Sequence, residues 1–96
     1  MDEFATKLKQ IIEDYPDILQ DKKALRGILA DVFPKEPKEV NLLMNGYDVG
    51  VVDLRDLPAD QLALRKAQLQ KKINTNFGVA ESNAMWIIDT WLYALN

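Results

Sequence analysis

The last seventeen residues, AESNAMWIIDTWLYALN from Ala80 to Asn96, constrain the fold more than any other stretch of the chain. At about 100° per residue, apolar residues recur on one side of this segment, which predicts a helix with a core-facing side. This stripe consists of Ala84, Ile88, Trp91, Leu92 and Leu95, and Ile87, Ala94 and Met85 widen it. A helix with so much apolar circumference is either central in a bundle or binds a partner on its second face.

Two aromatic residues lie on the opposite side of this predicted helix. Trp86 and Tyr93 are seven residues apart, and Asp89 and Thr90 lie between them. Amphipathic rings beside hydrogen-bonding groups are enriched at the centres of protein interfaces, so these four residues form a candidate partner-binding face. Alternatively, the helix is packed on both sides, with Trp86 against glycines from another helix. The second interpretation is favoured, because a small domain has few other large side chains for its core.

Residue types that the chain lacks restrict its chemistry. With 96 residues, it is long enough for one modest core, and we expect a single helical domain over residues 1–96. It contains neither cysteine nor histidine. Cysteine nucleophiles, disulfides and thiolate metal sites are therefore excluded, and the usual general base and commonest metal ligand are missing. Ser82, the only serine, has no histidine to activate it. We expect no catalytic residue, metal site or cofactor.

The charge distribution bears on partners and compartment. The formal net charge is −3, so the chain as a whole has no attraction to nucleic acid or anionic lipid. Acidic residues occupy the start, where a signal peptide would need a basic segment, and no apolar run approaches the roughly 18 residues of a membrane span. We expect a cytoplasmic protein that does not enter a membrane.

Prolines and capping residues divide the rest of the chain into further helices. A first helix should end at Pro16, a second should run over 22–32 behind the N-cap Asp21, a third over 37–51, and a fourth from about residue 59 to Phe77 before Gly78. Single turns are expected near 18–19 and within 52–58. The expected inward residues are Phe4, Leu8, Ile11, Ile12, Tyr15, Leu25, Ile28, Leu29, Val32, Val40, Leu43, Met44, Tyr47, Val51, Leu62, Leu69, Ile73 and Phe77. The fold class is therefore all-α, a compact bundle of four main helices plus short helical turns with the C-terminal Trp-rich helix central.

Two glycines lie within the predicted third helix. Gly46 and Gly50 are four residues apart, and each costs about 1 kcal/mol relative to alanine in a helix interior. Glycine leaves the backbone bare, so a bulky ring can lie directly against it. We therefore expect Trp86 or Trp91 to pack on this pair.

The fourth helix is locally basic and supports an alternative interpretation. Arg65, Lys66, Lys71 and Lys72 could contact phosphates in a helical nucleic-acid-binding domain. However, Lys71 falls nearly opposite Lys66 on the helix, so the four residues form no single stripe. A solvated face is the favoured interpretation, with the Lys66 methylenes lying on the core.

Two segments, PKEPKEVNLLMNGYDVGVVDL and FGVAESNAMWIIDTWLYAL, carry a resemblance. They are similar to a small α-helical domain of unassigned function that occurs alone or appended to larger bacterial proteins, some of them signalling kinases. The matching positions are Glu39 to Leu43, Gly46, Gly50, Gly78 to Glu81, Ala84, Trp86, Trp91, Ala94 and Leu95. Within them, Ala80 departs from the pattern, because that family tends to place a serine N-cap there. The resemblance implies a fold and no activity, since its motifs are packing motifs.

Together these observations predict a non-enzymatic protein-interaction or assembly module. Its partner would be another protein or a second copy of the same chain. Nucleic-acid binding through the fourth helix remains the alternative.

Overall fold

The computed structural model describes residues 2–96, and all of their regular structure is helical. The elements are α1 (Glu3–Asp14), the 3-10 helix η1 (Ile18–Gln20), α2 (Lys22–Val32), α3 (Pro37–Asp48), the 3-10 helix η2 (Val51–Asp56), α4 (Ala59–Phe77) and α5 (Glu81–Leu95). The all-α prediction is confirmed. Within residues 2–96 there are five α-helices and two 3-10 helices, so the expected count of four main helices is not confirmed.

Local capping chemistry sets several of these boundaries. The Asp21 carboxylate accepts a hydrogen bond of 3.1 Å from the backbone N–H of Ala24, which confirms the predicted N-cap of α2. Asp2 caps α1 in the same way, through a 3.0 Å bond from the N–H of Ala5. Gly78 follows α4 with a φ of 63°, the left-handed conformation in which glycine commonly ends a helix.

The predicted end of the third helix is wrong. α3 stops at Asp48, and Gly50 has a φ of 95°, so the chain turns there and η2 begins at Val51. Gly50 is therefore not a helix-interior residue. Because residues with a side chain rarely adopt this conformation, its glycine is explained by the turn rather than by a ring packed on it.

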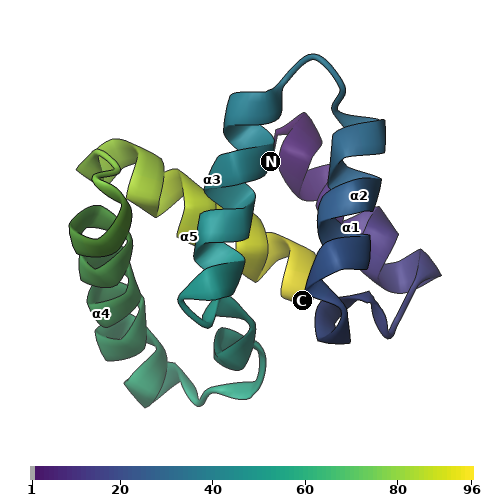
Figure 1. Cartoon of the computed structure of the whole chain (residues 1–96). Coiled ribbons are helices and arrows are strands. Elements are labelled where there is room, and N and C mark those ends of the chain that lie inside the picture. Colours follow the sequence, from purple (N-terminus) through teal and green to yellow (C-terminus); the bar gives the residue numbers. More distant parts are fainter. Residues whose placement is uncertain (1) are drawn as a thin grey trace.

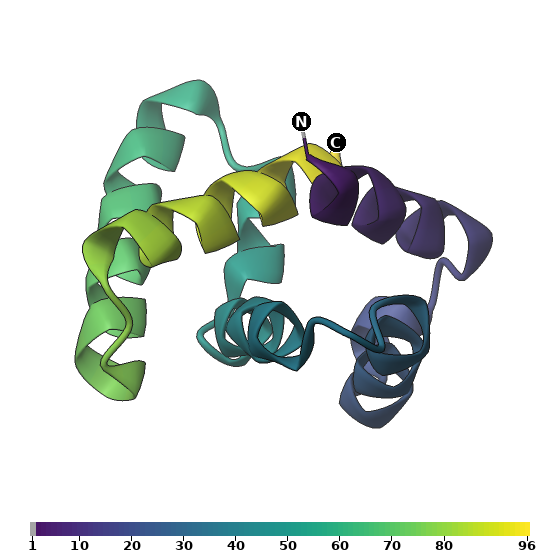
Figure 2. The same ribbon diagram turned by 90° about the horizontal axis from the view of Figure 1, so that it is seen from above.

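The helices form two layers closed at one end by α4. Seen from above, α1 and α5 lie in one layer, α2 and α3 lie in the other, and α4 stands across the end of both (Figure 2). In Figure 1, α5 passes behind α3, with α4 to its left and α1 and α2 to its right. α5 contacts α1, α3, α4 and η2, whereas α2 packs mainly on α3 and η1.

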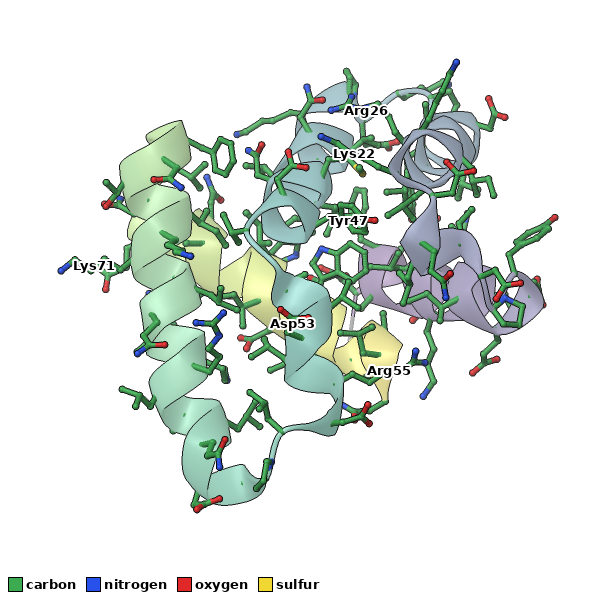
Figure 3. The ribbon with its side chains drawn as sticks, turned by 60° about the horizontal axis from the view of Figure 1, so that its bottom comes forward. Lys22, Arg26, Tyr47, Asp53, Arg55 and Lys71 are labelled. Atoms are coloured by element: carbon green, nitrogen blue, oxygen red, sulfur yellow. The ribbon has the colours of Figure 1, made fainter. Side chains whose placement is uncertain are left out.

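Polar contacts join α2 and its preceding turn to α3. Lys22 forms an ion pair of 2.8 Å with Asp48, and the Arg26 guanidinium donates a 3.0 Å hydrogen bond to the side chain of Asn41. The Tyr47 hydroxyl donates to the carbonyl oxygen of Leu19 at 2.7 Å. Figure 3 shows these basic side chains of α2 beside α3. η1 and α2 are therefore joined to α3 by bonds at three separate points.

The core is apolar and includes residues of every helix. Its largest fully buried side chains are Trp91, Leu8, Leu25, Leu29, Leu43, Met44, Leu69, Ile73, Ile87, Ile88 and Val51. Tyr15 and Phe77, expected to point inward, are instead 55% and 39% exposed. Tyr15 lies just beyond the end of α1, and Phe77 is the last residue of α4, so neighbouring helices do not cover them.

Candidate functional site

The aromatic face predicted on α5 is largely taken up by contacts within the chain. Thr90 is fully buried, which corrects the expectation that it lies on an exposed face. The Asp89 carboxylate lies 3.5 Å from the Lys66 ammonium of α4. Trp86 is half-buried, and Tyr93 is 39% exposed. The structure therefore does not bring the four residues together on one open surface.

Helix α1 covers this side of α5. The Trp86 ring meets the ring of Phe4 edge-on, with centroids 5.5 Å apart, and its Nε1 donates a 2.6 Å hydrogen bond to Asp2. Further along both helices, the Lys9 ammonium lies 5.0 Å from the centre of the Tyr93 ring. These contacts occur in the same order along the two helices, so α1 runs alongside α5 in the same direction. The second face of α5 is occupied by the chain's own first helix.

Trp91, rather than Trp86, fills the space above Gly46. A Cβ atom at Gly46 would lie 3.1 Å from Cδ1 and Nε1 of Trp91 and 2.5 Å from Cγ2 of Ile87. The Trp91 Nε1 donates a buried hydrogen bond of 2.9 Å to the carbonyl oxygen of Leu43. The predicted close approach of a ring to Gly46 is confirmed for Trp91. The expectation that Trp86 packs on Gly46 and Gly50 is wrong, because Trp86 turns towards α1.

The basic residues of α4 lie on different sides of that helix. Arg65 donates a 3.2 Å hydrogen bond to Gln68 and faces the hollow next to η2, whereas Lys66 faces α5 and pairs with Asp89. Lys71 and Lys72 are exposed, and Lys71 points away from the body of the molecule (Figure 3). The four side chains therefore do not gather into one phosphate-binding surface.

A groove between α4 and α5, which we call the outer groove, is the feature that sequence reasoning missed. It consists of two adjoining hollows of about 290 and 400 Å³ that share Ala67 and Gln70. Its lining comprises Ala63, Lys66, Ala67, Gln70, Lys71 and Asn74 of α4 and Glu81, Met85, Ile88 and Asp89 of α5. Met85, assigned to the flank of the core stripe from the sequence, is 51% exposed here. The small alanines opposite Met85 leave the groove open.

A second exposed apolar side chain is Leu64 of α4, which lies outside the outer groove. It is 65% exposed, and it borders a further hollow of about 370 Å³ together with Leu57 of the segment before α4. The sequence contained a signal for it, because Leu64 is out of phase with the inward stripe of Leu69 and Ile73. Exposed leucine and methionine side chains on adjacent helices are the composition expected of a docking surface.

Comparison of the chain with models of protein families, with curated proteins and with solved structures finds no match in any of the three. The resemblance to the small helical domain therefore rests on the motifs quoted above. Within residues 2–96, no helix has both the length and the apolar character needed to cross a membrane. No group of three or more acidic side chains in that range could hold a metal ion.

Proposed function

We propose that this chain is a non-enzymatic protein-interaction or assembly module that acts in the cytoplasm and binds a protein partner at the outer groove. The observation that carries the proposal is the exposure of Met85 in the outer groove, and Leu64 is exposed elsewhere on α4, in the hollow next to η2. Both are large and apolar, and both lie on helices whose other large apolar residues are mostly buried. Removing them from water on binding would contribute on the order of 1 kcal/mol or more each.

The shape of the outer groove supports a helical partner. A helix binds in such a groove by inserting apolar side chains spaced three or four residues apart. Ala63 and Ala67 line one wall and present little more than a methyl group each, so a partner helix could approach α4 closely. Met85 can adjust its side chain to different partners, because methionine is unbranched and flexible.

The role proposed for α5 follows from its neighbours. It contacts α1, α3, α4 and η2, and we propose that it is the central helix on which the others are arranged. In this view the aromatic side chains of α5 stabilise the domain, and its stripe of Glu81, Met85 and Asp89 binds the partner. The placement of the basic residues of α4 gives no comparable support to nucleic-acid binding, since Lys66 is directed to Asp89.

Capture from a cell extract tests this proposal with a matched pair of variants. Ala67 lines the outer groove, and Ala30 is an exposed alanine on α2, away from the groove. We expect Ala67→Glu to abolish capture of the partner, because it introduces a charge into the apolar part of the groove, and Ala30→Glu to leave capture unchanged. Both variants should keep a free energy of unfolding within about 0.5 kcal/mol of the parent, as surface substitutions commonly do.

Two results would contradict the proposal. One is equal capture by the parent and Ala67→Glu, which would show that the partner binds elsewhere. The other is the absence of any captured protein. Retention of the parent on a DNA column, with elution by salt, would favour the nucleic-acid alternative instead.

A further inference from the structure

The two walls of the outer groove carry opposite charges. On α5, Glu81, Met85 and Asp89 are spaced four residues apart and form one stripe, with a carboxylate on each side of the methionine. On α4, Lys66 and Lys71 lie on either side of the small Ala67. The α4 wall therefore has basic residues on both sides of the small Ala67, and the α5 wall has acidic residues on both sides of the large Met85.

Oppositely charged residues of the two walls border the groove at two levels along it. α4 and α5 are joined by the short turn after Gly78, and α5 doubles back from it (Figure 1). Lys71 and Glu81 border the same hollow near this turn. Lys66 and Asp89 form their 3.5 Å pair further from it. Along the groove from the turn, Lys71 and Glu81 therefore come first and Lys66 and Asp89 come second.

We propose that a second copy of this chain packs face to face over the outer groove and forms a symmetric dimer whose two-fold axis runs along the groove. Such an axis places α4 of the second copy over α5 of the first. Lys71 and Lys66 of one copy then lie against Glu81 and Asp89 of the other, and the reverse contacts follow by symmetry.

The same axis also matches large side chains to small ones. Met85 of each copy, which protrudes from α5, is placed over Ala63 and Ala67 of the other copy, where α4 carries only small side chains. A two-fold axis across the groove would instead place α4 on α4 and bring Lys66 close to Lys71 of the other copy, with like charges in contact. Charge and shape therefore select one of the two symmetric arrangements. The dimer rests on the proposed function, since it names the protein partner of the same groove.

Charge reversal on one wall at a time tests this arrangement. The first variant is Lys66→Glu with Lys71→Glu, and the second is Glu81→Lys with Asp89→Lys. Each variant has two walls of the same sign, so we expect its dimer dissociation constant to rise about 100-fold or more in sedimentation equilibrium at low salt. An equimolar mixture of the two variants should form a dimer again, because each wall then meets a wall of opposite sign. High salt should weaken the dimer of the parent chain, because its charges are exposed.

Matched variants separate this effect from misfolding and from total charge. Lys72→Glu changes the same charge on the neighbouring residue, which does not line the groove, and should leave the dissociation constant unchanged. The single reversals Lys71→Glu and Glu81→Lys leave the Lys66–Asp89 pair in place. They provide the same mixing test if a double variant fails to fold, as circular dichroism would show.

Three results would overturn the dimer. These are a parent chain that stays monomeric at millimolar concentration, a dimer that persists in both variants, and variants that remain monomeric when mixed. A monomeric parent that still captures another protein, with capture lost in Ala67→Glu, would overturn only the identity of the partner and keep the proposed function.

Discussion

The two sides of α5 are packed in opposite ways. Towards α3, Trp91 and Ile87 lie on Gly46 so closely that together they leave no room for a Cβ atom, which would be 2.5 Å from Cγ2 of Ile87 and 3.1 Å from the Trp91 ring. Towards the outer side of α4, Met85 faces alanines across an open groove and remains 51% exposed. The first contact packs a large ring against glycine, the smallest residue. At the groove, in contrast, the large methionine and the small alanines do not fill the space between them. Close packing identifies the side that stabilises the domain, and the unfilled side is available to a partner.

The largest expected effect comes from removing the ring on the closely packed side. Trp91→Ala should lower the free energy of unfolding by about 3–5 kcal/mol, because it leaves a cavity in the core. It also removes the donor that bonds to the carbonyl oxygen of Leu43. For a domain with a total stability of about 5–10 kcal/mol, this loss is between about a third and all of the total. Urea denaturation followed by circular dichroism measures the change, and a variant as stable as its parent would contradict the packing of this side.

A second variant adds a single methyl group to the same contact. Gly46→Ala should destabilise the fold by about 1–3 kcal/mol through overpacking, even though alanine is the better helix former. Gly27, in α2, is the matched control, because a Cβ atom there would meet nothing within 4 Å. Gly27→Ala should therefore stabilise the chain by about 0.5–1 kcal/mol. If both substitutions shift the thermal midpoint in the same direction, Ile87 and Trp91 of α5 do not restrict the backbone at Gly46.

The smallest destabilisation is expected between α1 and α5, at a residue of the predicted aromatic face. Trp86→Ala removes the edge-on contact with Phe4 and the hydrogen bond to Asp2, and should lower the free energy of unfolding by about 1–2 kcal/mol. The effect is smaller than for Trp91, because Trp86 is only half-buried. Capture of the partner should persist at a temperature where the variant is folded. Loss of capture by a folded variant would restore the aromatic face as the binding site.

Helix boundaries were predictable where they depend on adjacent residues. α2 and the end of α4 match the expected positions, because Asp21 and Gly78 act on their own helix ends through local geometry. The third helix was predicted too long because a glycine in a run of apolar residues is compatible with either a packed helix or a left-handed turn. Gly46 lies in the packed helix, and Gly50 lies in the left-handed turn.

The candidate site was predicted less well, for a physical reason. Periodicity shows which side chains share a face of a helix, but it does not show which neighbouring helix covers that face. Thr90 is buried and Met85 is exposed because α1 lies along one side of α5, while α4 leaves another side open. The contact between Asp2 and Trp86 spans 84 residues of sequence, and no local pattern indicates it.

The amino-acid sequence alone determined that this chain is helical, where most of its helices begin and end, and which residues form the main apolar stripes. These properties follow from backbone conformation and from the spacing of apolar residues along one segment. Only the tertiary structure decided which tryptophan lies on Gly46 and which stripe of α5 stays open, because both depend on the angles and distances at which separate helices meet.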